Sequence, residues 1–314
     1  MRRFNDLAVF LAVAFGGAWL VALPVWLGGS GQASPLLRPV AAGMMFTPTL
    51  GVLAVWIFCH RGTPFREWAR RTGLTWGPAR GRTLGLVAAT WLGVPLIVIA
   101  ALAVSALTGV VRLDIDGLSL FRQQLVAAGG VPVDPHTLVV VQLVMAVVVA
   151  PLLNAIPSLG EEWGWRGYLL PRLLGGSALD AAPRPARQVW RAMLVSGVIW
   201  GVWHAPLTLL GYNYPDLGPW AAPMFVGVCV LLGAILGWLR LRTGSVWPAV
   251  VGHGAFNASA GLMLLLGDAA APPDLALAGV TGLVGWAVLA VVVVLLGSPY
   301  RGRVAVGAPT RAEG

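Results

Sequence analysis

The segment VVVQLVMAVVVAPLLNAIPSLGEEWGWRGYLL, residues 139–170, decides the fold. It belongs to an apolar run over residues 136–159, which meets the roughly 17 to 25 residues that a helix needs to cross a bilayer. The run leads directly into Glu161, Glu162 and Arg166. Because ionisable side chains at membrane depth cost free energy, their default interpretation is a functional site.

The composition also indicates a membrane protein. The chain is 58% hydrophobic and 11% charged, whereas a soluble domain carries about a quarter charged residues. The other apolar segments of sufficient length are 7–28, 38–60, 83–108, 190–211, 221–240, 245–267 and 275–297. The sequence therefore predicts an all-α, polytopic membrane protein with about eight transmembrane helices. We expect residues 1–300 to form one membrane domain, with the polar motifs within 136–267, and residues 301–314 to be a disordered cytoplasmic tail.

The basic residues indicate an orientation in the membrane. All 21 are arginines, and with the N-terminus inside only Arg38, Arg112 and Arg122 fall in outside loops. This bias over short loops predicts a multi-pass protein of the cell membrane with both termini in the cytoplasm. It also accounts for the net charge of +9 without a nucleic-acid partner, since no basic helix or aromatic stacking module accompanies the dispersed arginines. We expect the polar residues to lie near the cytoplasmic ends of their helices, in a cytoplasm-facing cavity.

The spacing of the polar residues separates their tasks. On a helix, residues four apart share a face, so Glu162 can meet Arg166, while Glu161 lies about 100° away. A glutamate paired with a guanidinium is held ionised and oriented, which leaves Glu161 as the better proton acceptor. His253 and Asn257 are also four apart, and two convergent donors suit an oxyanion formed at a peptide carbonyl.

Three motifs together resemble those of the CPBP family of intramembrane proteases, also called ABI, which includes the Ras-converting CAAX prenyl endopeptidase. They are EEWGWR at 161–166, WGVWH at 200–204 and HGAFN at 253–257. The family commonly has Phe where this chain has Trp200, a change that keeps a bulky ring. The resemblance covers the chain from about residue 136 to residue 267. The prediction of the remaining helices depends on the membrane topology alone.

The resemblance implies an intramembrane endopeptidase and a role for each residue. Glu161 and His204 would activate a water, Glu162 and Arg166 would shape the site, and His253 and Asn257 would stabilise the oxyanion. The implied substrate is a peptide or a membrane-anchored protein within the lipid bilayer. A prenylated CAAX protein is the substrate of the best-known relatives, but the arginine-only composition is typical of a GC-rich bacterial genome, where such substrates are not expected.

Three alternatives stay open at this point. A zinc-dependent version of the same protease needs His and Glu ligands, but the chain has no HEXXH motif, and Arg166 would repel a cation from Glu162. We therefore expect no cofactor, although zinc is not excluded. A transporter or channel would also bury Glu, His and Arg, and would predict inverted repeats, which we do not find. A non-enzymatic membrane partner that has kept the motifs is the third.

Overall fold

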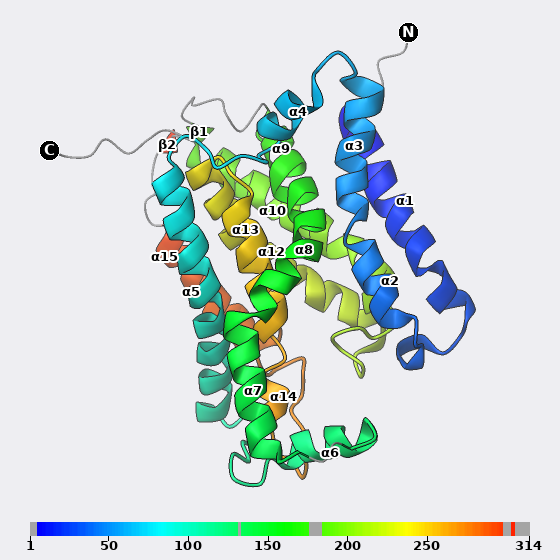
Figure 1. Cartoon of the computed structure of the whole chain (residues 1–314), viewed down its shortest axis with the longest axis vertical. Coiled ribbons are helices and arrows are strands. Elements are labelled where there is room, and N and C mark those ends of the chain that lie inside the picture. Colours follow the sequence, from blue (N-terminus) through cyan, green and yellow to red (C-terminus); the bar gives the residue numbers. More distant parts are fainter. Residues whose placement is uncertain (1–4, 131–132, 176–183, 298–302, 305–314) are drawn as a thin grey trace, which may run out of the picture.

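The computed structural model of the chain is almost entirely helical (Figure 1). It describes residues 5–130, 133–175, 184–297 and 303–304, so most of the expected tail at 301–314 lies outside the described residues. The α-helices are α1 (Asp6–Leu27), α2 (Leu37–Met44), α3 (Thr47–Cys59), α4 (Phe65–Arg71), α5 (Arg80–Leu107), α6 (Ser119–Ala127), α7 (Pro135–Val148), α8 (Ala150–Glu162), α9 (Leu170–Leu173), α10 (Ala186–Trp203), α11 (Ala205–Thr208), α12 (Ala221–Thr243), α13 (Trp247–Ser259), α14 (Met263–Leu266) and α15 (Leu283–Gly297). Within the described part of the chain, the strands are β1 (Arg184–Pro185) and β2 (Arg303–Val304), which pair antiparallel.

The helices confirm an all-α, multi-pass membrane protein. Five spans among the described residues are long and apolar enough to cross a bilayer, and a sixth results if the bent pair α7 and α8 is one span. The expected count of eight is not confirmed, because α15 is a shorter apolar helix and α10 is not among these spans. α15 begins at Leu283 rather than near residue 275, after a segment that contains Pro272, Pro273 and Gly279, the last with φ of +71°.

Prolines interrupt three of the expected spans. Pro48 follows the break between α2 and α3, Pro151 follows the 48° bend between α7 and α8, and Pro206 follows the break between α10 and α11. Proline has no N–H to donate to the preceding turn and disfavours helical geometry in the residue before it. The third break falls at His204, which is the C-cap of α10. This predicted site residue therefore lies where the helix is interrupted.

Glycines allow the helices that carry the motifs to pack closely. A Cβ at Gly254 of α13 would lie 2.6 Å from the carbonyl oxygen of Pro151 in α8. A Cβ at Gly201 of α10 would lie 2.6 Å from the Cα of Val226 in α12. Small residues bring membrane helices into contact in this way. As a result, α8 faces α13 and α10 faces α12 at backbone distance.

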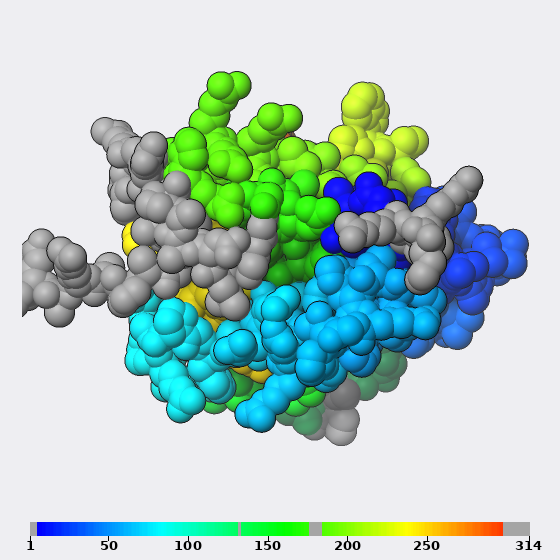
Figure 2. Space-filling model, turned by 90° about the horizontal axis from the view of Figure 1, so that it is seen from above, coloured from blue at the N-terminus to red at the C-terminus, as the bar shows by residue number. Residues whose placement is uncertain are grey.

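The molecule has two ends that differ in charge. The arginine-rich end carries the start of α1, the segment 60–79, α9 and the turn 240–246 (Figure 1). Figure 2 looks onto this end, where the segment 60–79, in light blue and cyan, lies beside the green region around α9. The opposite end, here called the cavity end, carries the segments 28–36, 108–130, 209–220 and 260–282.

Candidate active site

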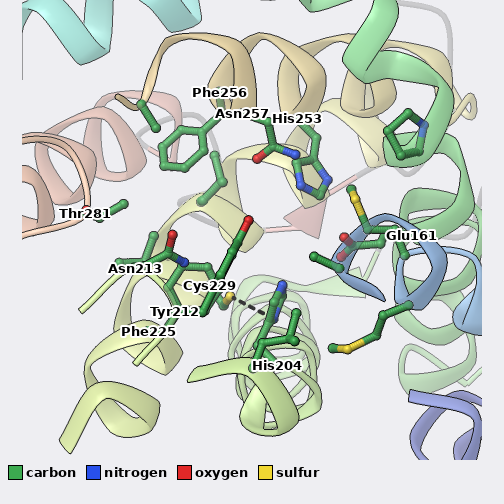
Figure 3. A pocket seen from close by; sticks show the side chains of 18 of the residues that line it. Glu161, His204, Tyr212, Asn213, Phe225, Cys229, His253, Phe256, Asn257 and Thr281 are labelled. Atoms are coloured by element: carbon green, nitrogen blue, oxygen red, sulfur yellow. Dashed lines mark hydrogen bonds between the residues drawn. The ribbon is translucent and has the colours of Figure 1, made fainter. Parts of the chain in front are cut away.

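A cavity of about 430 Å³ lies between α2, α8, α10, α12 and α13. Four of the six predicted site residues line it, namely Glu161, His204, His253 and Asn257. They approach the cavity from three directions, with Glu161 from α8, His204 from the end of α10, and His253 with Asn257 from α13 (Figure 3). Glu162 and Arg166 are not among the residues that line it, and both are buried behind its wall.

Glu162 is the centre of a buried ionic group. Its Oε1 accepts a hydrogen bond from Nη1 of Arg166 at 2.7 Å, so the predicted ion pair is present. The same oxygen lies 2.9 Å from Nδ1 of His253, a contact that spacing along one helix did not predict. The Arg166 guanidinium also lies over the ring of Trp200, with its Cζ 4.1 Å from the ring centroid. Glu162 thus ties α8 to α13 and fixes the position of two further predicted site residues.

Glu161 has different partners. Its Oε2 accepts a hydrogen bond from the indole Nε1 of Trp200 at 2.6 Å and a longer one from Nε1 of Trp165 at 3.4 Å. Both donors are neutral, and Glu161 as a whole residue is 1% exposed while lining the cavity. The two adjacent glutamates are therefore separated as expected, one in an ionic group and the other at the cavity wall. The role of Trp165 could have been found from the sequence, because it stands four residues after Glu161.

The hydrogen bond of His204 defines its tautomer. Its Nδ1 lies 2.9 Å from the carbonyl oxygen of Trp200. A carbonyl oxygen only accepts, so Nδ1 carries the proton and Nε2 of the neutral ring holds a lone pair. The rings of Trp203 and Phe225 each lie 4.7 Å from the imidazole, centroid to centroid, and restrict its motion. Trp200 therefore orients both His204 and Glu161, through its backbone and its side chain respectively.

His253 and Asn257 stand one turn apart on α13. His253 is 4% exposed, and its Nδ1 contacts Glu162. Because an ionised carboxylate only accepts, Nδ1 carries a proton there, and His253 can donate from Nε2 only when the ring is doubly protonated. Asn257 is exposed at the cavity, where its amide can donate without any change of charge. Asn154, one of the polar residues of the apolar run, also lines the cavity and donates from Nδ2 to the carbonyl of Ala150.

The cavity does not open where the sequence analysis expected. Its exposed lining residues form a mouth made of Arg38, Ala42, Asn213, Asn257 and Gly261. They belong to α2, to the end of α13 and to the segments 209–220 and 260–282, and these segments lie at the cavity end. The helix continues beyond Glu161 to Leu173, which adds roughly 15 Å toward the arginine-rich end at about 1.5 Å per residue or less. Glu161 is therefore deep in its span. The mouth thus lies at the end opposite to the arginine-rich one.

The donor set does not suit zinc as it is arranged. Within the described residues, no group of three or more His, Cys, Asp or Glu side chains is placed to hold a metal ion, whereas catalytic zinc takes three protein ligands. Glu162 is engaged by Arg166 and His253, and Glu161 by two indole donors. The two cysteines are far apart in the sequence, and Cys229 contacts Nδ1 of His204 at 3.8 Å.

Comparison with known proteins agrees with the motifs. Residues 136–259 match the model of the type II CAAX prenyl endopeptidase Rce1-like family. The chain is also similar to "CAAX prenyl protease 2" of Methanococcus maripaludis, with 26% identity over 113 residues. That alignment covers 34% of this chain and 38% of the relative, so the chain spans well under half the length of the relative it matches. The matched segment contains all six predicted site residues, so the similarity to the CAAX prenyl endopeptidase family covers the part of the chain that carries the three motifs.

Proposed function

We propose that this protein is an intramembrane endopeptidase that hydrolyses a peptide bond of a membrane-associated protein or peptide. The observation that carries the proposal is the position of Glu161, whose carboxylate is held by indole donors at the wall of a cavity that His204, His253 and Asn257 also line. A peptidase needs a base for the water and donors for the oxyanion, and these four side chains provide both. Residues 1–300 would form one membrane domain.

The proposed reaction begins with a water between Glu161 and His204. Glu161 accepts a proton from this water as its oxygen attacks the scissile carbonyl carbon, and the lone pair on Nε2 of His204 accepts a hydrogen bond that orients the water. A positioned base contributes on the order of 10² to 10⁴ in rate. The electron pair of the carbonyl moves onto its oxygen, and the C–N bond then breaks as the amine receives the proton held by Glu161. Atoms and charge balance without a covalent enzyme intermediate.

The tetrahedral oxyanion would be stabilised from α13. Asn257 donates from its amide, and His253 donates from Nε2 in its doubly protonated form. Glu162 orients the His253 ring, because its carboxylate accepts from Nδ1 at 2.9 Å. Arg166 in turn orients Glu162 through a hydrogen bond of 2.7 Å. Loss of one oxyanion donor costs about 10² to 10³ in kcat in a well-studied protease.

Cleavage by the purified protein tests the proposal. We would reconstitute wild type and Glu161→Gln in proteoliposomes, and follow cleavage of a library of membrane-anchored peptides by mass spectrometry. Glu67→Gln is the matched control, because Glu67 lies in α4 at the arginine-rich end and pairs with Arg71. We expect cleavage by wild type and the control and at least a hundredfold loss with Glu161→Gln. Equal cleavage by wild type and Glu161→Gln would refute the role of Glu161.

We also propose that the arginine-rich end lies in the cytoplasm, with both termini on that side. The support is the distribution of arginines: among those that the structure describes, only Arg112 and Arg122 at the cavity end, and Arg38 at the start of α2 beside it, lie away from the arginine-rich end. Reporters fused to the C-terminus test this orientation. A fluorescent protein that matures only in the cytoplasm should be bright there, and alkaline phosphatase, which is active only after export, should be inactive. The reverse pair of results would overturn the orientation.

A further inference from the structure

The cavity has a mouth at one end of the molecule and a packed wall at the other. The exposed lining residues Arg38, Ala42, Asn213, Asn257 and Gly261 all lie toward the cavity end. The buried lining residues, such as Trp200 and Leu232, form the floor of the cavity. A water or a peptide that enters by the mouth reaches Glu161 without crossing a packed layer.

Aromatic side chains close the route from the arginine-rich end. Trp165 and Phe10 are fully buried, and their ring centroids lie 5.6 Å apart. Tyr168 packs on Phe10 at 4.8 Å, and Trp203 packs on Trp165 at 5.6 Å. These rings stand between Glu161 and that end, because the helix runs from Glu161 through Trp165 and Tyr168 toward α9. A second cavity of about 200 Å³ lies beyond them, and of the described residues that line it none lines the first.

The arginine distribution then determines which face of the membrane the mouth meets. If the arginine-rich end is cytoplasmic, the mouth opens toward the opposite face. We propose that the scissile segment enters from the non-cytoplasmic face, so that the substrates are exported peptides or proteins anchored from that side. This inference rests on the proposed function for what happens to the substrate, and on the geometry of the mouth for how it enters. The lining residues Met44, Leu207 and Phe256 are apolar, so the segment that fills the cavity is expected to be apolar as well.

Cysteine labelling tests the direction of access without relying on cleavage. Gly261→Cys places a thiol at the mouth, and Gly62→Cys places one at the arginine-rich end; a Cβ at either glycine has no neighbour within 4 Å. Ala42→Cys is a second mouth reporter, in case Gly261→Cys folds poorly. Each is introduced into a Cys59→Ser, Cys229→Ala background and treated with a membrane-impermeant maleimide in intact spheroplasts and in inverted vesicles.

We expect both mouth reporters to be labelled in spheroplasts and Gly62→Cys only in inverted vesicles. Labelling of the mouth reporters only in inverted vesicles would overturn the proposal. The same labelling pattern in a protein that never cleaves any peptide would leave the access route standing and refute the proposed function. In proteoliposomes sorted by orientation, added peptide should be cut only where the mouth faces outward; cutting only in the other orientation also contradicts the proposal.

A second inference concerns Arg240, a buried cation near the site. Residues Trp163–Leu169 form a π-helix, in which the N–H of Leu170 donates to the carbonyl of Trp165, five residues earlier. The next bond in this pattern would join residue 171 to the carbonyl of Arg166, but Pro171 has no N–H. Nε of Arg240, on α12, donates to that carbonyl at 3.0 Å. Arg240 therefore supplies the donor that the proline lacks.

The surroundings of Arg240 support a specific role. The side chain is 0% exposed, and Nη1 and Nη2 have no hydrogen-bond partner among the described residues. A Cβ at Gly73, whose φ is +92°, would lie 2.9 Å from the guanidinium. Burying a cation without a counterion costs free energy. We therefore expect the buried guanidinium of Arg240 to have a structural or functional role that offsets this cost. We infer that Arg240 is a positioning residue. By holding the π-helix in place, it also fixes the position of Arg166 and the contact between Glu162 and His253.

A double-mutant cycle tests this role. Arg240→Met removes the donor, while Pro171→Ala supplies an N–H at the position where the π-helix lacks one. We expect Arg240→Met to lower kcat about tenfold or more with little change in KM, since small misplacements of catalytic groups are costly. Adding Pro171→Ala should restore a large part of kcat. An unchanged kcat in Arg240→Met, or a loss that Pro171→Ala leaves untouched, would refute the inference.

Hydrogen exchange gives a readout that does not depend on proteolysis. Amides of residues 163–170 should exchange faster in Arg240→Met than in wild type, and Pro171→Ala should slow them again. Amides of α5 serve as the internal reference, because that helix packs chiefly on α13 and α15, whereas the π-helix packs chiefly on α3, α8 and α9. Uniformly faster exchange over the whole protein would show a general loss of stability and contradict a positioning role.

Discussion

The indole of Trp200 donates a hydrogen bond to Glu161 at 2.6 Å, across 39 positions of sequence. The backbone carbonyl of the same tryptophan holds Nδ1 of His204 at 2.9 Å. One residue thereby sets the orientation of both groups that are proposed to activate the water. The family commonly has Phe at this position, which keeps the backbone contact and lacks the indole donor.

Replacing Trp200 with phenylalanine separates the two contacts. Trp200→Phe keeps the carbonyl that orients His204 and removes the donor to Glu161. A hydrogen bond to a charged group contributes about 1.5 to 3 kcal/mol, and Trp165 remains as a weaker donor. We expect kcat to fall about tenfold, measured in proteoliposomes. Trp220→Phe, at a residue that is 75% exposed, should have no effect; equal rates for the two variants would contradict a role for the indole.

The close contact of α8 with α13 is a condition for the Glu162–His253 pair. Gly254→Ala would place a Cβ 2.6 Å from the carbonyl oxygen of Pro151 and push the two helices apart. Overpacking of this kind costs about 1 to 3 kcal/mol. We expect a lower unfolding temperature and a reduced kcat. Gly93→Ala in α5 is the control, because a Cβ there has no neighbour within 4 Å and alanine is the better helix former.

Metal removal tests the proposed water activation by side chains alone. One oxygen of each glutamate already accepts from a donor, Oε2 of Glu161 from Trp200 and Oε1 of Glu162 from Arg166, and a metal ion at either of these oxygens would have to displace that donor. We expect dialysis against a chelator to leave the cleavage rate unchanged, and elemental analysis of the active protein to find metal well below one ion per chain. Loss of activity with the chelator, and its recovery on adding zinc alone, would favour the metal-dependent alternative.

Local spacing predicted part of the site, and packing between distant segments determined the rest. The pairing of Glu162 with Arg166 follows from residues four apart on a helix. The contact of Glu162 with His253 joins positions 91 residues apart and depends on how α8 meets α13. The helices themselves lie close to the apolar runs, because period and composition act locally. Their interruptions at Pro151 and Pro206 are local too, and they could have been read from the sequence.

The end of the molecule at which the cavity opens could not be predicted from local sequence patterns. Arginines mark the cytoplasmic ends of spans, but they do not show how far along a helix a polar residue lies. The helix passes Glu161 and continues through the π-helix to Leu173, so the carboxylate sits deep in the span instead of at its arginine-rich end. His204 likewise belongs to the last part of α10, which points to the cavity end. The direction of each span, together with its bends, decided where the mouth formed.

The two adjacent glutamates should respond differently to the same substitution. Glu161→Gln keeps an oxygen that accepts from Trp200, so the unfolding temperature should stay near that of wild type while cleavage is lost. Glu162→Gln removes the charge between Arg166 and His253 and leaves a guanidinium that is 1% exposed without its counterion. Breaking a buried pair from one side costs about 3 to 5 kcal/mol, so this variant should lose both stability and activity. Thermal unfolding in detergent and cleavage in proteoliposomes, measured on the same preparations, compare the two. If Glu161→Gln were the less stable variant, or if both lost stability equally, the assignment of Glu161 to the water and Glu162 to the ionic group would be wrong.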